Sequence, residues 1–277
     1  MTLNEWVAAS AAFHPDRDNA LMETRYLATH ITGISPTQQR IHNPVLSATQ
    51  EESLNSLAQR LHRGEPLAYL LGSQPFYGLE LQVNHHTLIP RNDSESVVDR
   101  ALTLIQDCHA PVIIDLGTGS GALALAIAAA RPDAIVSASD QSDEALSIAA
   151  TNARAYQLEN ITFLQANWLQ AYQDCYADLI ISNPPYIAAD DPHLDALQYE
   201  PKSALIADDN GYRDLLTIME QAPRVLKPQG WLLMEHGWQQ AETLRMQAIA
   251  NPIWQQIASH PDYAGRDRMT EMQKRGQ

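Results

Sequence analysis

The tetrapeptide Asn183-Pro184-Pro185-Tyr186 combines groups that could hold a planar amide or amine. It directly follows the apolar run 177–182. Two prolines remove two backbone donors and fix two φ angles, so the strand must end and a stiff loop must begin. The Asn183 side-chain oxygen and the Pro184 carbonyl could then accept hydrogen bonds from an NH2 group lying against Tyr186. For the tetrapeptide alone, a proline-rich turn with a capping asparagine is an equal alternative.

A glycine-rich stretch earlier in the chain predicts a ligand-binding turn. The apolar run 112–116 leads into Gly117-Thr118-Gly119-Ser120-Gly121, and an alanine-rich helix is expected over 122–130. The next strand, 134–139, ends at Asp140. This order is typical of a βαβ unit, in which a carboxylate at the end of the second strand can accept hydrogen bonds from both hydroxyls of a ribose.

Two cofactors compete for this unit. Gly117-x-Gly119-x-x-Ala122, with Asp140 further on, fits a dinucleotide fingerprint loosely. Asp115-x-Gly117-x-Gly119-x-Gly121 is instead associated with S-adenosylmethionine. A carboxylate at Asp115 would repel a pyrophosphate and attract a cationic ligand. The segment therefore favours a methyltransferase over a dehydrogenase, and a tight turn without a ligand stays open.

Two further strands are expected to end at the same place. The strand 161–165 ends at Ala166-Asn167-Trp168, where a polar and an aromatic side chain could hydrogen-bond and cover an adenine ring. Ordinary core packing of Trp168 is the alternative. The strand 178–182 delivers the Asn183 loop. Because parallel strands place their carboxyl ends at one edge of a sheet, these groups should meet there.

The remaining elements frame a two-part chain with a linker. Helical spacing of apolar residues predicts about four helices before residue 70, with Leu3, Trp6, Val7, Leu21, Tyr26, Leu27, Leu54, Leu57 and Leu61 as core, and Ser47 or Thr49 beginning the last helix. We expect a helical domain over 1–72, a β-hairpin linker over 73–91 and an α/β, doubly wound domain over 92–277. In the last part we expect helices over 211–226 and 239–249, a turn at 227–230, a strand over 231–236 and a final hairpin around 263–268.

Composition narrows the function classes. The chain has 277 residues, 45% of them hydrophobic, and a formal net charge of −15, which disfavours broad contact with nucleic acid. Cys108 and Cys175 are too few for a disulfide framework and are expected to be buried thiols. His14, His30, His42 and His62 lack metal-ligand spacing, so we expect surface histidines and no metal. Without a basic leader or a long apolar run, we expect a cytoplasmic protein that does not enter a membrane.

The chain resembles the HemK/PrmC protein-(glutamine-N5) methyltransferases. The resemblance is carried, in family order, by Glu65 to Gly72, Phe76 to Leu79, Leu88 to Arg91, Asp115 to Gly121, Asn183 to Ile187 and Glu235 to Gln240. Asn-Pro-Pro-Tyr alone is shared with DNA adenine-N6 methyltransferases, but the combination is far more specific. One turn departs from the pattern. The family reads Pro-Arg-Pro-Glu-Thr-Glu where this chain has Pro90-Arg91-Asn92-Asp93-Ser94-Glu95, so no role is assigned to residues 92–94.

The resemblance implies a Rossmann-like class I methyltransferase domain and an activity. The methyl group would pass from S-adenosylmethionine to the glutamine of the Gly-Gly-Gln motif in peptide-chain release factors, leaving S-adenosylhomocysteine. By resemblance, Gly117, Thr118, Gly119, Ser120, Gly121 and Asp140 hold the cofactor, Trp168 contacts its adenine, and Asn183, Pro184, Pro185 and Tyr186 hold the substrate glutamine, with Asn183 also reaching the cofactor. The helical domain would recognise the protein substrate, and the enzyme would be a monomer.

The residues themselves suggest how such a site would work. Asn183 and Pro184 would orient the amide nitrogen for in-line attack, and the Tyr186 ring would pack on the amide and favour developing positive charge. No general base is obvious, because Glu235 and His236 are adjacent in a strand and should face opposite sides. The rival functions are an adenine methyltransferase acting on DNA or RNA, a non-catalytic cofactor-binding subunit, and an NAD-dependent dehydrogenase.

Overall fold

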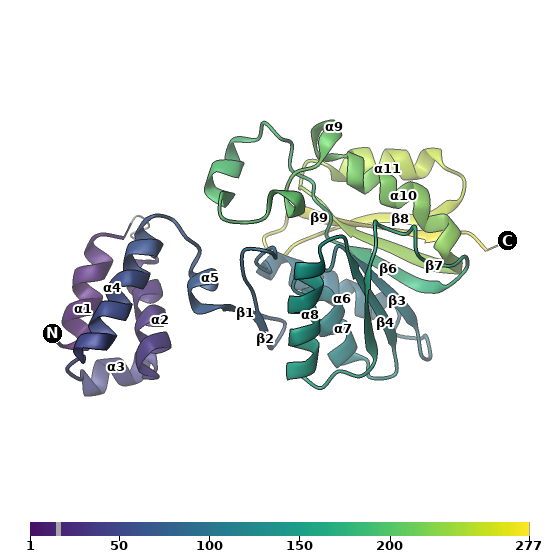
Figure 1. Cartoon of the computed structure of the whole chain (residues 1–277). Coiled ribbons are helices and arrows are strands. Elements are labelled where there is room, and N and C mark those ends of the chain that lie inside the picture. The colour runs from purple at the N-terminus through teal and green to yellow at the C-terminus, as the bar shows by residue number, and fades with distance from the viewer. Residues whose placement is uncertain (15–17, 277) are drawn as a thin grey trace. The chain divides into compact units, whose positions relative to one another are not determined.

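A computed structural model describes residues 1–14 and 18–276 (Figure 1). The chain divides into two compact units, Met1–Ser73 and Gln74–Gln277. The first unit is helical, whereas the second is built on a β-sheet.

The helical unit contains α1 (Leu3–Ala12), α2 (Ala20–Thr32), α3 (Pro36–His42), α4 (Ala48–His62) and the short α5 (Leu67–Leu71). Capping boxes begin three of these helices, at Thr2, Ser35 and Ser47. In each box the hydroxyl accepts a hydrogen bond from the backbone N–H three residues on, and the side chain there accepts one from the backbone N–H of the cap residue. Ser47 is thus confirmed as a helix start, and its partner is Gln50.

The core of the helical unit corresponds only in part to the predicted one. Leu3, Trp6, Val7, Leu27, Leu54 and Leu61 are buried together. Leu21 and Tyr26 are 58% and 43% exposed, so their prediction as core residues is wrong; they lie on the solvent side of α2. His14 is buried and pairs with Glu23 at 2.8 Å, so its prediction as a surface residue is also wrong.

A two-stranded hairpin, β1 (Ser73–Phe76) and β2 (Leu79–Gln82), follows. Its turn residues, Tyr77 and Gly78, both have positive φ, as the tightest hairpin turns require. Asn152 in the sheet-based unit pairs with the hairpin edge: its side chain accepts from the Gln82 N–H at 2.7 Å and donates to the Gln82 carbonyl at 3.1 Å.

The main sheet has seven strands in the order β5-β4-β3-β6-β7-β9-β8. They are β3 (Val112–Leu116), β4 (Ile135–Asp140), β5 (Ile161–Gln165), β6 (Ala177–Ser182), β7 (Leu226–Glu235), β8 (Trp254–Pro261) and β9 (Asp267–Lys274). The first five of these strands in chain order are parallel, and β9 and β8 add an antiparallel end. The expected doubly wound α/β fold is confirmed.

Helices cover both faces of this sheet (Figure 1). On one face lie α6 (Glu95–Leu104), α7 (Ala122–Ala130) and α8 (Asp143–Ala155), and on the other lie α10 (Arg213–Val225) and α11 (Ala241–Ala250). Successive residues of β3 serve the two cores in turn: Ile113 packs with the first set and Ile114 with the second. Because strand side chains alternate, one short apolar strand builds both layers.

Several short elements complete the unit: η1 (Asn92–Ser94), η2 (Pro192–Leu197), η3 (Lys202–Ala204) and α9 (Asp208–Gly211). The turn predicted at 227–230 lies inside β7 and forms an irregularity in its pairing with β6. The final hairpin is confirmed, with residues 263–266 as its turn.

Both cysteines are free but exposed, so their predicted burial is wrong.

The chain order reverses between β3 and β6, which run side by side with Leu116 opposite Ser182. Leu116 also lies opposite Ser139 of β4. The residues that follow, Gly117, Asp140 and Asn183, therefore emerge next to one another at the carboxyl edge. In open α/β sheets ligands bind at such a switch point.

Candidate functional site

The loop Asn183 to Tyr186 begins where β6 ends. The Ser182 hydroxyl donates to the Leu116 carbonyl at 2.8 Å, which ties the start of the loop to the end of β3. Pro184 is buried, and Asn183, Pro185 and Tyr186 are half-buried. Burial raises the pKa of Tyr186 to about 12, so its phenol is neutral at physiological pH. The loop thus carries a neutral aromatic ring three residues after Asn183.

Two residues from later in the chain fix the end of this loop. Gln240 Nε2 donates to the carbonyls of Tyr186, at 3.3 Å, and Gly211, at 3.2 Å. The oxygen of the same side chain accepts from the Gly237 N–H at 2.8 Å. Gly211 has a φ of +85°, and a Cβ there would overlap the carbonyl of Tyr186. Only glycine therefore fits against the loop at this position.

The glycine-rich turn lies opposite. Thr118 N–H donates to the Ser139 carbonyl at 2.9 Å, and Gly121 N–H donates to the Thr118 carbonyl at 2.8 Å. The φ of Gly117 is +68°, and a Cβ there would lie 3.5 Å from the ring of Trp168. The side chains of Thr118 and Ser120 are buried. The turn is thus closed tightly by its own backbone and presents glycine surface to the cavity.

Two carboxylates flank this turn. Asp140 accepts from Gly119 N–H at 2.9 Å and from Ser142 N–H at 3.0 Å, one bond to each oxygen. Asp115 is buried and accepts from the Thr118 hydroxyl at 2.6 Å. Burial raises the pKa of both, that of Asp115 to about 7. A carboxylate oxygen can accept more than one hydrogen bond, so Asp140 retains acceptors for ligand hydroxyls.

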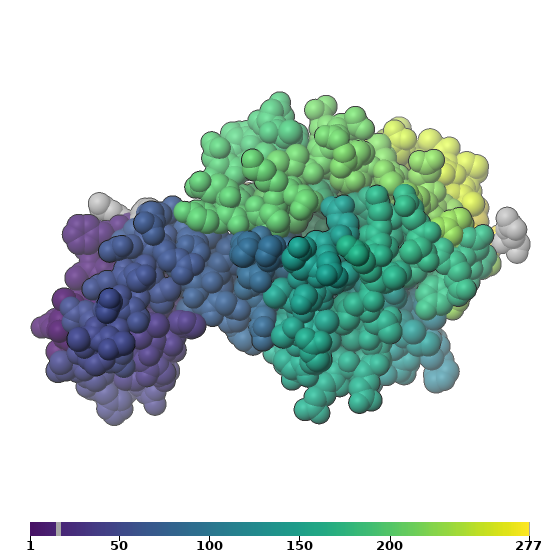
Figure 2. Space-filling view, in the orientation of Figure 1, coloured from purple at the N-terminus to yellow at the C-terminus, as the bar shows by residue number. Residues whose placement is uncertain are grey.

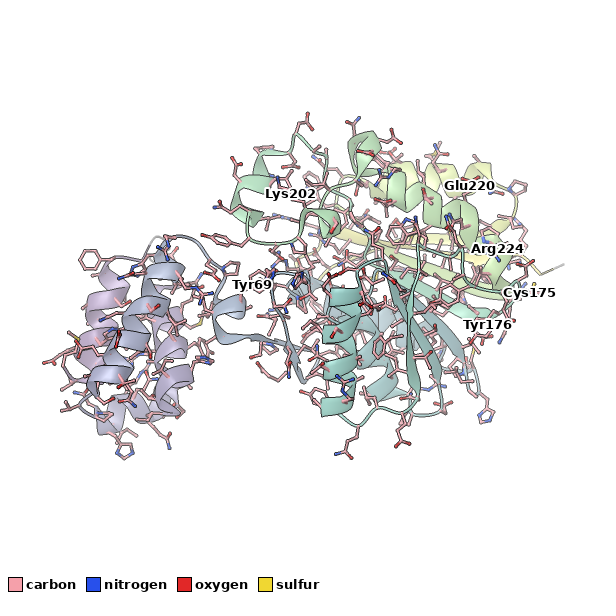
Figure 3. The ribbon with its side chains drawn as sticks, in the orientation of Figure 1. Tyr69, Cys175, Tyr176, Lys202, Glu220 and Arg224 are labelled. Carbon is pink, nitrogen blue, oxygen red and sulfur yellow. The ribbon has the colours of Figure 1, made fainter. Side chains whose placement is uncertain are left out.

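Trp168 adopts a backbone conformation that is unusual for a bulky residue, with a φ of +46°. The loop that carries it is fixed from α10. Gln221 accepts from the Leu169 N–H at 3.1 Å, and Arg224 donates to the carbonyls of Leu169 at 2.7 Å and Tyr172 at 2.8 Å. Figure 3 shows Arg224 close to Cys175, whose N–H donates to the Arg224 carbonyl at 3.0 Å. The surrounding structure therefore maintains the strained position of the indole.

A cavity lies between these loops. Its lining includes six of the residues predicted from the sequence: Gly117, Gly119, Asp140, Trp168, Asn183 and Pro185. Ser203 and Ala204 of η3 also line it, and in the space-filling view the green segment that contains η2 and η3 lies above the teal surface (Figure 2). The lining also includes Asn167, at the position expected to contact adenine, together with His86, Leu88, Gln141, Ser142, Ala145, Ser139 and Ala166.

A second cavity adjoins the first and shares Gly117, Gly119 and Asn183 with it. Thr118 and Ser120 line this second cavity, together with Asp115, Arg91 and Ser94. Gly121, Pro184 and Tyr186 line neither cavity, and their roles stay predictions. Arg91 forms an ion pair with the buried Glu200, which also accepts from Ile89 N–H at 3.0 Å.

The turn that departs from the family pattern contributes directly to the site. Ser94 is buried, and Asn183 Nδ2 donates to its hydroxyl at 3.4 Å. The family threonine at this position is thus replaced by another hydroxyl residue. Sequence reasoning assigned Ser94 no role, because only the fold brings it to Asn183, 89 residues away. In the sequence, only the position of Ser94 inside the family turn pattern at residues 90–95 pointed to a role in the site.

Glu235 is a further residue that sequence reasoning left aside. It ends β7, is 2% exposed, and lies beside the side chains of Ser94 and Asn183, which interact with its carboxyl group. Burial raises its pKa to about 7, and the neighbouring side chains of Ser94 and Asn183 oppose the shift. His236 points to the other face and bonds Thr270 at 2.7 Å, so the expected separation of the two side chains is confirmed.

In the described ranges no group of three or more His, Cys, Asp or Glu residues could hold a metal ion. No helix in the described part of the chain is both long and apolar enough to cross a membrane.

Comparison with known proteins places this geometry in context. A family described as "Methyltransferase domain" matches residues 109–276, and one described as "PrmC N-terminal domain" matches residues 5–72. A release factor glutamine methyltransferase of Salmonella typhimurium is 39% identical over 98% of both chains. One of Xylella fastidiosa is 44% identical over 81% of this chain and 82% of the relative. A methyltransferase structure from Pyrococcus furiosus, 15% identical, shares the fold over 72% of this chain and 90% of its own, with a TM-score of 0.52.

Proposed function

Because this chain belongs to the release factor glutamine methyltransferase family, we propose that it methylates the side-chain amide nitrogen of a release factor glutamine. It is a methyltransferase that uses S-adenosylmethionine. The observation that carries the proposal is the position of Asn183. Asn183 lines both the cavity that contains Asp140 and Trp168 and the adjoining cavity that contains Asp115 and Thr118.

The residues of the first cavity fit S-adenosylmethionine. Asp140 offers carboxylate oxygens for ribose hydroxyls, and Trp168 offers an aromatic wall beside Asn167. Lys and Arg are absent from the described lining, which gives a pyrophosphate no cationic partner there. Asp115 adds negative potential beside the glycine turn, which suits a sulfonium. These features favour the methyl donor over the dinucleotide that was its rival.

The cofactor supplies an electrophilic methyl group when it is bound. The chain's own residues position the acceptor, whose amide nitrogen is a poor nucleophile because its lone pair is delocalised. Asn183 Oδ1 and the Pro184 carbonyl accept from the two N–H groups of the glutamine, which orients the nitrogen and favours a pyramidal geometry. Tyr186 packs against the amide plane, and its neutral ring favours developing positive charge. Positioning is the main contribution to the rate.

We propose roles for the rest of the chain as well. Residues 1–72 recognise the release factor, and residues 92–277 catalyse the methyl transfer. Residues 73–91 link these two domains. The helical unit has its own core and leaves Leu21, Met22 and Tyr26 exposed on α2, which supports a docking role. We propose further that the enzyme acts as a cytoplasmic monomer. The net charge of −15 supports recognition of a basic protein surface rather than nucleic acid.

Labelled S-adenosylmethionine tests the function, with purified release factor and duplex DNA as acceptors. We expect label on the release factor, lost when the Gly-Gly-Gln glutamine is replaced and reduced at least about 100-fold by Asn183→Ala. Label on DNA would establish the adenine reaction instead. Bound cofactor with no transfer to either would leave the non-catalytic function.

A further inference from the structure

A buried carboxylate lies directly behind the loop that carries Asn183. Glu235 shares a strand face with Leu233, which packs toward α6, and Ser94 immediately precedes that helix. Among the described residues, Glu235 Oε2 has no hydrogen-bond partner. A buried carboxylate loses much hydration energy, and apolar residues of similar size usually replace such groups without loss of stability. If Glu235 had only a structural role, its burial would lower the stability of the folded state without any compensating benefit.

Charge neutralisation does not account for Glu235. Arg268 is a cation whose field acts on it, but Arg268 already has other carboxylate partners. Its Nε lies 3.2 Å from Asp262, and its Nη2 lies 3.8 Å from Asp93. Pairing with Arg268 therefore does not explain why a carboxylate is buried at position 235.

The contacts of Glu235 define the orientation of one amide. Asn183 Nδ2 donates to the Ser94 hydroxyl at 3.4 Å, and the carboxyl group of Glu235 lies beside both side chains. The pKa of Glu235 is about 7, so above that pH its carboxylate is ionised and only accepts hydrogen bonds, which favours the NH2 end of Asn183 over the oxygen end. The Asn183 oxygen is consequently directed away from Glu235.

We propose that Glu235, together with Ser94, is a positioning residue that fixes the Asn183 amide with Oδ1 toward the substrate. The inference rests on the proposed function, in which Asn183 accepts from the glutamine NH2. If the Asn183 amide were turned by 180°, its NH2 group would face the NH2 group of the substrate glutamine. Two donors cannot form a hydrogen bond with each other, so the substrate nitrogen would lose its orientation. Glu235 acts only through Asn183 and does not touch the reacting atoms.

Glu235→Gln tests the proposal, because a glutamine can either donate to or accept from Asn183 and so no longer selects one orientation. We expect kcat to fall about 10- to 100-fold, as for other misplaced catalytic groups, with the Kd for S-adenosylmethionine within about twofold of wild type. Ser94→Ala should lower kcat in the same way, and Ser94→Thr, which keeps the hydroxyl, should lower it less. Glu271→Gln is the matched control: Glu271 is a buried carboxylate opposite Leu233 that pairs with Arg100 rather than with Ser94 or Asn183. It should leave kcat unchanged.

A double-mutant cycle separates positioning from structure. In an Asn183→Ala background, Glu235→Gln should change kcat by less than about twofold. Asn183→Asp offers a rescue, because the amide introduced by Glu235→Gln can donate to an aspartate whose oxygens need no orientation. Asn183→Asp alone places two carboxylates together, so the pair with Glu235→Gln should recover kcat at least about tenfold.

Equal losses from Glu235→Gln in both backgrounds, with no rescue, would overturn the proposal and leave Glu235 as a structural residue. Thermal unfolding of each variant checks folding, and Ser94→Ala supplies the cycle if Glu235→Gln fails to fold. Wild-type transfer to release factor tests the proposed function separately, so the two ideas can fail independently. If the wild-type enzyme methylates another acceptor, the kcat ratios of the variants to the wild type are measured with that acceptor instead.

Discussion

Nε2 of Gln240 donates to the carbonyl of Tyr186 from the start of α11, 54 residues further along the chain. The bond holds the end of the Asn183 loop against a part of the chain that contributes nothing to either cavity. Gly211 lies between them and shares the same donor. The stiffness of the loop therefore comes from this packing as well as from its two prolines.

Gly211→Ala should damage the loop more than its backbone strain alone would. At a φ of +85° an alanine costs about 1 kcal/mol, and its Cβ would also overlap the Tyr186 carbonyl. We expect a loss of stability of about 2–4 kcal/mol and a kcat reduced at least about tenfold. Gly265→Ala is the control, since its φ of +80° is similar but its Cβ would meet nothing. Equal losses of stability in chemical denaturation would show that the overlap is relieved without moving the loop.

Asp140→Asn should weaken cofactor binding. Asp140 accepts from Gly119 and Ser142 and faces the cavity, and charged hydrogen bonds contribute about 1.5–3 kcal/mol each. We expect the Kd for S-adenosylmethionine to rise about 10- to 100-fold in titration calorimetry. Asp133→Asn, which alters an exposed carboxylate paired with Arg131, should leave the Kd unchanged. An unaltered Kd for Asp140→Asn would place the ribose elsewhere.

Asp115 should make stability depend on pH in an identifiable direction. Burial raises its pKa from 3.8 to about 7, so the folded state binds this proton more tightly than the unfolded state does. The contribution of Asp115 is fully present below about pH 4 and is lost as pH rises toward 7. Asp115→Asn should remove that slope and raise stability at pH 8 by a few kcal/mol, on the order implied by the shift.

The same substitution should oppose cofactor binding, because it removes negative charge beside a cationic ligand. Denaturant unfolding at pH 4 and pH 8 measures the slope, and titration with S-adenosylmethionine measures the affinity. Parallel pH profiles for Asp115→Asn and wild type would contradict the assignment of this titration to Asp115.

Arg224→Met should release the Trp168 loop. The guanidinium donates to the carbonyls of Leu169 and Tyr172, and without these bonds Trp168 is free to leave its φ of +46°. We expect the Kd for S-adenosylmethionine to rise about three- to tenfold, since one to two hydrogen bonds of about 1 kcal/mol support the indole. Arg154→Met, whose guanidinium bonds only the Thr151 hydroxyl among the described residues, is the matched control. If Arg224 acts through Trp168, adding Arg224→Met to Trp168→Ala should not raise the Kd for S-adenosylmethionine any further.

The positions of the ligand-binding loops could be predicted because they depend on local pattern. Apolar runs that end in glycines, in Asp140 or in Asn-Pro-Pro-Tyr identify parallel strands and their carboxyl ends, and parallel strands bring those ends together. The residues behind the loops could not be predicted in the same way. Ser94, Gln240 and Arg224 act through contacts 89, 54 and 55 residues distant in the chain. No periodicity marks such contacts, and only matched motifs drew attention to two of the three.

The errors have physical causes too. Leu21 and Tyr26 follow the helical period but lie on the open side of α2, because a period does not say which stripe is covered. The turn expected at Gly230 is absorbed into β7 as an irregular pairing. The sequence shows the charge of Asp115 but not its burial, which keeps that charge partly neutralised by a proton near pH 7.

The pairing of β3 with β6 also determines when the site can exist during folding. Leu116 and Ser182 are 66 residues apart, and the whole β4-β5 half of the sheet is made between them. Closing so large a loop is slow, because its entropy is lost before the contacts form. A chain leaving the ribosome can build the glycine turn and Asp140 while Asn183 is still unmade. Because Asn183 and Pro185 also line the cavity of Asp140, full cofactor affinity and catalytic competence should arise together, once β6 has been made and has paired with β3.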